Sequence, residues 1–269
     1  MIDWKDAATE FIEFLASFLA TGAIGFRLAV LNRVIEEREF HRSAALRAAT
    51  LGVIGSIVTT ILYFMGDRQT TLQTVLMIAA IVGFILVIAR VSAGWWIAAI
   101  GVVFAPLTPA FSGQWAKTIN PVHRLAAGFW IGTLFIVVIA ALGPLLRSRF
   151  AGERRGAFAA AMINAFSPLA LGSAFVLVVF GVITAWRHLK YVAALWTTSY
   201  GYALIAKLFV VLIVVALGAW NWRRQRPLLG TESAATAIRR SAAVELTAAL
   251  VVLILTAILV SLPTPKLPG

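Results

Sequence analysis

The stretch "NPVHRLAAGFWIGTLFIVVIAALGPLL", Asn120 to Leu146, is one apolar run of 27 residues. An α-helix rises about 1.5 Å per residue, so roughly 20 such residues cross a hydrocarbon core of about 30 Å. Lipid offers the backbone no hydrogen-bond partner, and a helix satisfies its own N–H and C=O groups. The run is also too long and too uniformly apolar for a barrel strand. The stretch therefore predicts a membrane-spanning α-helix.

The rest of the chain repeats this pattern. Of its 269 residues 61% are hydrophobic and only 13% are charged, with a mean hydropathy of +0.93, which excludes a water-soluble domain. We predict an all-α, polytopic transmembrane helix bundle that forms a single integral membrane domain, 1–269. Its N-terminal four-helix half covers 1–115 and its C-terminal four-helix half 120–263. The eight predicted spans are 9–31, 44–65, 70–90, 92–112, 120–146, 160–187, 199–222 and 241–262.

Charged residues predict how the bundle is oriented. The net charge is +12, and of the 23 Lys and Arg residues fifteen lie on the side that holds the connections after the odd-numbered spans. Seven lie on the other side, and one is inside a span. The positive-inside rule then places both termini outside the cytoplasm. The acidic start "MIDWKDAATE" argues against a removable signal peptide. The basic patches are interpreted as contacts with anionic lipid, which predicts no nucleic-acid partner.

Few side chains are available as metal ligands. The chain has no cysteine and three histidines, and no paired histidines at metal-ligand spacing. Nor does it contain a phosphate-binding glycine loop or a Ser/His/Asp arrangement, so we predict that it is not an enzyme. His123 at the outer start of the fifth span and His188 at the outer end of the sixth are candidate ligands for a metal or a haem. Met65 is a candidate soft ligand at the outer end of the second span.

Polar residues in or near the spans are candidates for a transport path or for structural contacts. Lys207 lies about eight residues into the seventh span, at a depth where an ammonium needs a partner or a wet cavity. Glu13 and Glu245 each lie about one turn from a helix end, where they are interpreted as partners of nearby Arg or backbone groups. Small residues at helical spacing, such as Gly128 and Gly132, predict close approach of neighbouring helices. Gly101 and Ala105 show the same spacing.

The segment "FSPLALGSAFVLVVFGVITAWRHLKYVAALWTTSYGYALIAKLFVVLIVVALGAWNWRR", Phe166 to Arg224, together with the helix that carries Glu245, resembles the CopD family of bacterial copper-resistance and copper-uptake proteins. The resemblance extends to "VHRLAAGFWIG", which contains His123. It implies an eight-helix inner-membrane protein that moves copper inward, often from a periplasmic carrier of the CopC type. Tyr200 and Lys207 then line or gate the path.

One position departs from the family pattern. The fourth helix of the family commonly ends with Gly followed by His, and here the pair is Gly113 and Gln114. We expect Gln114 to face His123 across the short outer connection. Because glutamine is a poor Cu(I) ligand, three interpretations stay open. The chain is a copper transporter, an accessory or structural subunit of a larger membrane complex that has lost the metal site, or a b-type haem protein with His123 and His188 as axial ligands.

Overall fold

All regular secondary structure in the part of the chain that the structure describes is helical. The structure is a computed structural model that describes residues 3–35, 37–66, 70–147, 152–225 and 232–265. Within these residues, eight helical stretches are long and apolar enough to cross a membrane, which confirms the all-α, eight-span prediction. They are Trp4–Val34, Arg38–Phe64, Thr71–Ile88, Gly94–Phe111, Trp115–Leu145, Arg155–Leu189, Ser199–Ala216 and Ala243–Ser261.

The spans are built from regular helices joined by short π and 3₁₀ segments. The α-helices are α1 (Trp4–Phe26), α2 (Asn32–Val34), α3 (Arg38–Phe64), α4 (Thr71–Ile88), α5 (Gly94–Phe104), α6 (Thr108–Phe111), α7 (Ile119–Ala127), α8 (Thr133–Ile136), α9 (Gly143–Arg147), α10 (Gly152–Leu189), α11 (Ala194–Thr197), α12 (Ser199–Gln225) and α13 (Glu232–Ser261). The π segments are η1 (Arg27–Leu31), η4 (Gly128–Gly132) and η5 (Val137–Leu142), and the 3₁₀ turns are η2 (Ala105–Leu107) and η3 (Trp115–Thr118).

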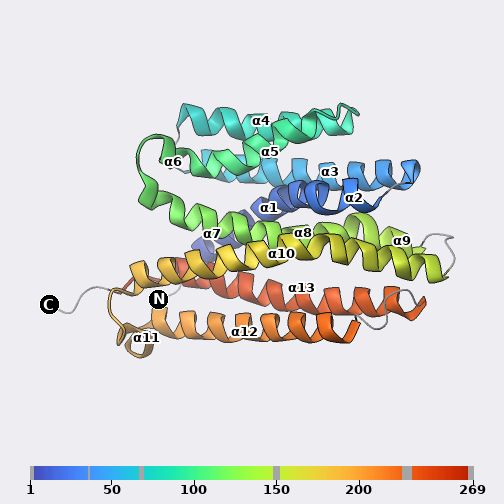
Figure 1. Cartoon of the computed structure of the whole chain (residues 1–269). Helices are drawn as coiled ribbons and strands as arrows, with labels where there is room; N and C mark the ends of the chain where they lie inside the picture. Colours follow the sequence, from blue (N-terminus) through green and yellow to red (C-terminus); the bar gives the residue numbers. More distant parts are fainter. Residues whose placement is uncertain (1–2, 36, 67–69, 148–151, 226–231, 266–269) are drawn as a thin grey trace.

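The first and fifth spans occupy the middle of the bundle. Figure 1 shows α4 and α5 along one edge and α12 along the opposite edge, with α1 and the α7–α9 stretch between them. The start of α1 and the end of α13 lie at the end of the bundle that also carries α6 and α11 (Figure 1). Such an arrangement follows from an even number of antiparallel spans. It brings the starts of α1 and α7 close together, where the charged side chains lie.

Glycines let the two central spans approach backbone to backbone. A Cβ added at Gly132 would collide with the carbonyl of Phe18, and one at Gly22 would collide with the backbone of Gly132. Gly128 packs against the side chain of Thr21 in the same crossing. The close approach predicted for Gly128 and Gly132 is therefore confirmed, and α1 is the helix that packs against them.

One hydrophobic core joins residues of both four-helix halves. It contains Phe26 of α1 and Phe84 of α4 together with Ile136 of α8 and Met162 of α10, each fully buried. The two halves thus contribute to one core, and a single membrane domain stays our prediction. The π segment η5 exposes a carbonyl to a neighbour, since Arg47 of α3 donates a hydrogen bond of 3.1 Å to Ala140 O.

Candidate functional site

His123 lies between α7 and α10, where its imidazole is held by a backbone carbonyl. The Nδ1 atom is 3.0 Å from Leu177 O on α10. A carbonyl only accepts, so Nδ1 carries the hydrogen and Nε2 of the neutral ring keeps its lone pair. This arrangement, in which one ring nitrogen is fixed by a carbonyl, is the usual one for an imidazole that binds a metal through the other nitrogen.

A glycine on α10 makes room for this ring. A Cβ added at Gly181 would lie 3.0 Å from Cε1 of His123 and 3.4 Å from its Nδ1. The ring is therefore packed against the backbone of α10 one turn after Leu177. The sequence alone does not mark Gly181, because the partner of an isolated glycine in an apolar helix depends on which helix lies beside it.

Further polar contacts fix α7 and α10 relative to each other. Thr184 Oγ1 donates to Asn120 Oδ1 at 2.9 Å, and Arg187 donates to the carbonyl of Ala116 at 2.6 Å. With the His123 contact, they form a row of hydrogen bonds along the two antiparallel helices. These contacts hold α7 and α10 in a fixed relative position, and so they also fix the position of the imidazole between the two helices.

His188 lies farther along α10 and is engaged by its own helix. Its Nδ1 is 2.8 Å from Thr184 O, and its ring stacks on Tyr200 with centroids 6.3 Å apart. The carbonyls that hold the two imidazoles belong to Leu177 and Thr184, seven residues or about 10 Å apart along the helix. Two nitrogens that share one ion lie roughly 4 Å apart. The spacing favours two separate imidazoles over a pair that shares a metal or a haem iron.

Lys207 is half-buried on α12 and lies within electrostatic range of the His123 imidazole. The ammonium is therefore part of the surroundings of His123. Tyr200 lies seven residues earlier on the same helix and is 6% exposed. The Lys207 charge thus acts on the candidate ligand from α12, while His123 itself contacts α10.

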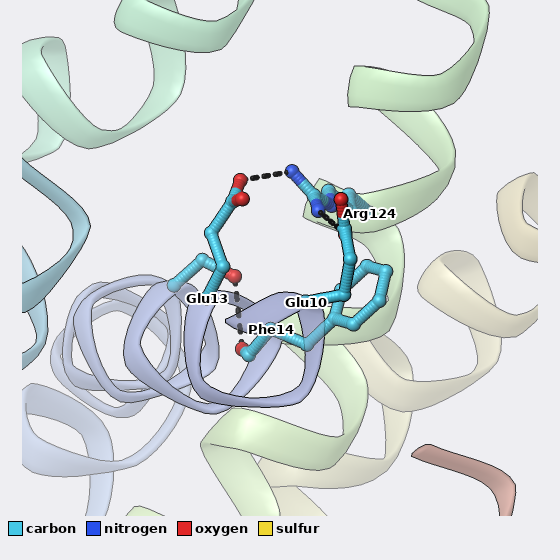
Figure 2. Close-up of polar contacts among 5 residues, drawn as sticks. Glu10, Glu13, Phe14 and Arg124 are labelled. Atoms are coloured by element: carbon cyan, nitrogen blue, oxygen red, sulfur yellow. Dashed lines mark hydrogen bonds and ion pairs between the residues drawn. The ribbon is translucent and has the colours of Figure 1, made fainter. Parts of the chain in front are cut away.

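Glu13 belongs to an ion cluster that joins α1 to α7. Arg124 Nη1 is 2.5 Å from Glu13 Oε1, and Nη2 is 3.1 Å from Glu10 Oε2. The guanidinium also stacks over the ring of Phe14 at 4.3 Å (Figure 2). Glu13 is thus a partner of an arginine, as its position near a helix end indicated. The pairing of Glu13 with Arg124 has no sequence signal, because 111 residues separate them in the chain.

The remaining predicted residues differ in their exposure and contacts. Met65 is 76% exposed at the end of α3, and Gln114 is exposed in the turn before η3. His123 packs against α10 through Leu177 O, and the expected facing of Gln114 and His123 stays a prediction. Glu245 on α13 accepts a hydrogen bond of 3.4 Å from Ser241. The described residues contain no group of three or more His, Cys, Asp or Glu able to hold a metal ion.

Loss of Arg124 should destabilise the end of the bundle where α1 and α7 begin. Arg124→Met leaves two carboxylates unpaired in a half-buried position, and we expect the free energy of unfolding to fall by about 2 kcal/mol. Unfolding of the purified protein in detergent, titrated with a denaturing detergent, measures the change. Lys117→Met, which removes an exposed cation from η3, is the matched control and should leave stability unchanged. Equal stability of the two variants would show that the cluster contributes little.

The fold and the side chains define a polytopic helical membrane protein with a half-buried imidazole between its fifth and sixth spans. Residues 160–259 match the model of a protein family, CopD, which is described as copper resistance protein D. This stretch, the CopD-family segment, is similar to that family and contains Gly181, Tyr200, Lys207 and Glu245, whereas His123 precedes it. No solved structure matches the chain.

One curated relative agrees with the family match. The chain is 28% identical over 187 residues to the copper transport protein CutJ of Bacillus subtilis (strain 168). The alignment covers 66% of this chain and 32% of that protein. The chain thus spans about a third of the length of the relative. The likeness supports the same family without transferring the activity of the whole relative.

Proposed function

We propose that this protein carries copper ions across the bacterial inner membrane toward the cytoplasm. Among the observations that support the proposal, the geometry of His123 carries it: Nδ1 is fixed to Leu177 O of α10, a helix of the CopD-family segment, and Nε2 keeps a free lone pair. Imidazole is a suitable ligand for copper. A periplasmic carrier of the CopC type is proposed to deliver the ion. The lipid bilayer surrounds the bundle, and the protein acts as a transporter rather than as an enzyme.

A single strong ligand suits a site that must also release its cargo. Conduction requires binding that is favourable enough for entry and weak enough for exit. The Lys207 ammonium near His123 opposes a second positive charge there, and so shortens the time that the ion spends on the imidazole. His123 therefore acts as a transient binding site for the copper ion, and Lys207 limits the affinity of this site for copper.

Copper entry into vesicles tests the proposal directly. Right-side-out inner-membrane vesicles that contain the protein and a trapped Cu(I)-responsive dye should gain fluorescence faster than vesicles without the protein when Cu(I) is added outside. Under an identical gradient, inside-out vesicles should gain fluorescence only at the slower rate of the vesicles without the protein. Equal rates with and without the protein would reject copper transport, and faster entry into inside-out vesicles would reject the inward direction.

The inward direction requires the termini to face the periplasm, as the charge asymmetry of the sequence predicts. Alkaline phosphatase fused to the C-terminus should be active, and a fluorescent protein that folds only in the cytoplasm should be dark. The same two reporters inserted in the connection between α1 and α3 should give the opposite result. A fluorescent C-terminal fusion would invert the orientation and place His123 near the cytoplasmic face.

Removal of the Lys207 charge should strengthen copper binding and slow transport. Lys207→Met keeps the length of the side chain, and we expect the Kd for Cu(I) to fall roughly tenfold because one nearby positive charge is lost. Competition with a Cu(I) chelator measures the affinity, and the vesicle assay measures the rate. Lys207→Arg keeps the charge and should resemble the unmodified protein. Unchanged affinity with reduced stability would identify Lys207 as a structural anchor.

A further inference from the structure

A cavity of about 660 Å³ is lined mostly by the N-terminal half and lies outside the CopD-family segment. It is an open cavity bordered by α1, α3, α4, α5 and the start of α7, and the exposed Gly66 is one of its lining residues. From the level of Tyr63 to that of Ser56 it extends seven residues, or about 10 Å, along α3. It therefore reaches about a third of the way into a hydrocarbon core of roughly 30 Å.

The α3 wall of this cavity is a row of hydroxyl groups. The hydroxyl stripe consists of Ser56, Thr59, Thr60 and Tyr63, all of which line the cavity. Their spacing of three, four and seven residues puts them on one face of the helix. In a membrane span such a face is costly against lipid tails and is expected where the helix borders water or polar groups.

Two of these hydroxyls have no partner within the described part of the protein. Thr60 Oγ1 donates to Ser56 O at 2.7 Å, and the Tyr63 hydroxyl accepts from the backbone N–H of Thr70 at 2.7 Å. Ser56 Oγ and Thr59 Oγ1 are buried without a hydrogen bond, and Ser56 is only 5% exposed. A buried hydroxyl without a partner costs free energy that water or a polar ligand recovers. At about 30 Å³ per water molecule, the cavity has room for many.

The charges at the cavity favour cations. Glu13 and Arg124 both line it, and Arg124 is held by Glu10 and Glu13 together (Figure 2). Two carboxylates against one guanidinium leave this cluster with a net charge of −1. A low-dielectric wall focuses such a charge into the cavity and raises the local concentration of cations. The oxygen atoms of the hydroxyl stripe are hard donors, which suit hydrated cations better than soft ones.

We propose that the cavity is a water-filled vestibule that takes up hydrated cations from the end of the bundle that carries both termini. It is separate from the His123 site, because Pro121, Arg124 and Leu125 face the cavity while His123 faces α10 on the other side of α7. The proposal goes beyond copper transport and does not depend on it. It gives the N-terminal half a role in ion entry.

The absence of cysteine from the sequence allows a direct test. Thr59→Cys and Ser56→Cys should each react with a membrane-impermeant, positively charged methanethiosulfonate added on the side of the termini. Ile61→Cys is the matched control on the same helix, because Ile61 is 53% exposed on the outer face of the bundle and should be covered by lipid. Reaction of the cavity variants no faster than that of Ile61→Cys would show that the cavity is dry and would overturn the proposal.

The charge of the reagent tests cation preference. At Thr59→Cys the cationic reagent should react at least about tenfold faster than an anionic one of similar size, after correction for their rates with a free thiol. Glu13→Gln in this background brings the cluster to neutrality and should reduce the ratio toward one. An unchanged rate with a neutral maleimide shows that the variant is folded and the cavity open. In the Thr59→Cys protein that retains Glu13, a reaction with the anionic reagent as fast as or faster than that with the cationic reagent would overturn cation uptake.

Discussion

Replacement of His123 with alanine should lower the initial rate of copper entry into vesicles by at least about tenfold. The imidazole supplies the free Nε2 lone pair on which the proposed site depends, and its Nδ1 is bound to Leu177 O. The protein should still fold, because α7 and α10 keep their Asn120–Thr184 and Ala116–Arg187 contacts. A matched control is His41→Gln, which changes the histidine at the opposite end of the bundle. Similar transport by His123→Ala and the unmodified protein would remove His123 from the path.

A variant on the facing helix separates ligand position from ligand identity. Gly181→Val leaves His123 in place but fills the space against its ring, since even a Cβ at this position lies 3.0 Å from Cε1. We expect a smaller loss of copper entry than for His123→Ala, with unchanged amounts of folded protein. Gly172→Val changes the same helix where a Cβ meets nothing within 4 Å, and should have no effect on transport. Equal rates of copper entry for the two glycine variants would show that the exact position of the His123 ring is unimportant for transport.

The sequence predicts the spans well because a single physical constraint controls them. A backbone in lipid must be helical over about 20 residues, so hydropathy alone is sufficient to locate each helix. The helices extend beyond the apolar runs, as in α10 from Gly152 to Leu189, because polar residues continue a helix outside the hydrocarbon. The glycine pair Gly128 and Gly132 is also readable, since small residues four apart have few other uses in a span.

The candidate site is less predictable, because its contacts join residues distant in the chain. The position of His123 at the mouth of a span marks it as a candidate ligand, but its carbonyl partner Leu177 is 54 residues away and carries no sequence signal. The pairing of Arg124 with Glu10 and Glu13 is hidden for the same reason. The hydroxyl stripe is different, because the spacing of Ser56, Thr59, Thr60 and Tyr63 is visible in "SIVTTILY". A polar face of this kind within an apolar helix is a signal that the amino-acid sequence itself carries.

The crossing of α1 with η4 should be the most sensitive point of the fold. In Gly132→Ala the new Cβ would collide with the carbonyl of Phe18, which is helix backbone and cannot rotate aside. The two central spans must then separate over their length of contact, which loosens the packing of Gly22 and Gly128 as well. Overpacking in a well-packed core typically costs 1–3 kcal/mol, and a backbone collision belongs at the upper end, about 3 kcal/mol.

Unfolding of the purified protein in detergent measures this cost, and Gly172→Ala is the control. Both variants replace glycine with alanine inside a helix, which by propensity alone stabilises the helix by about 1 kcal/mol. At Gly172 no atom lies within 4 Å of the added Cβ, so that variant should be as stable as the unmodified protein or slightly more stable. The difference between the two variants isolates the steric term, because the change in backbone entropy is common to both. If Gly132→Ala were as stable as Gly172→Ala, the two central spans would not be in backbone contact, and the shared core of the two halves would need a different explanation.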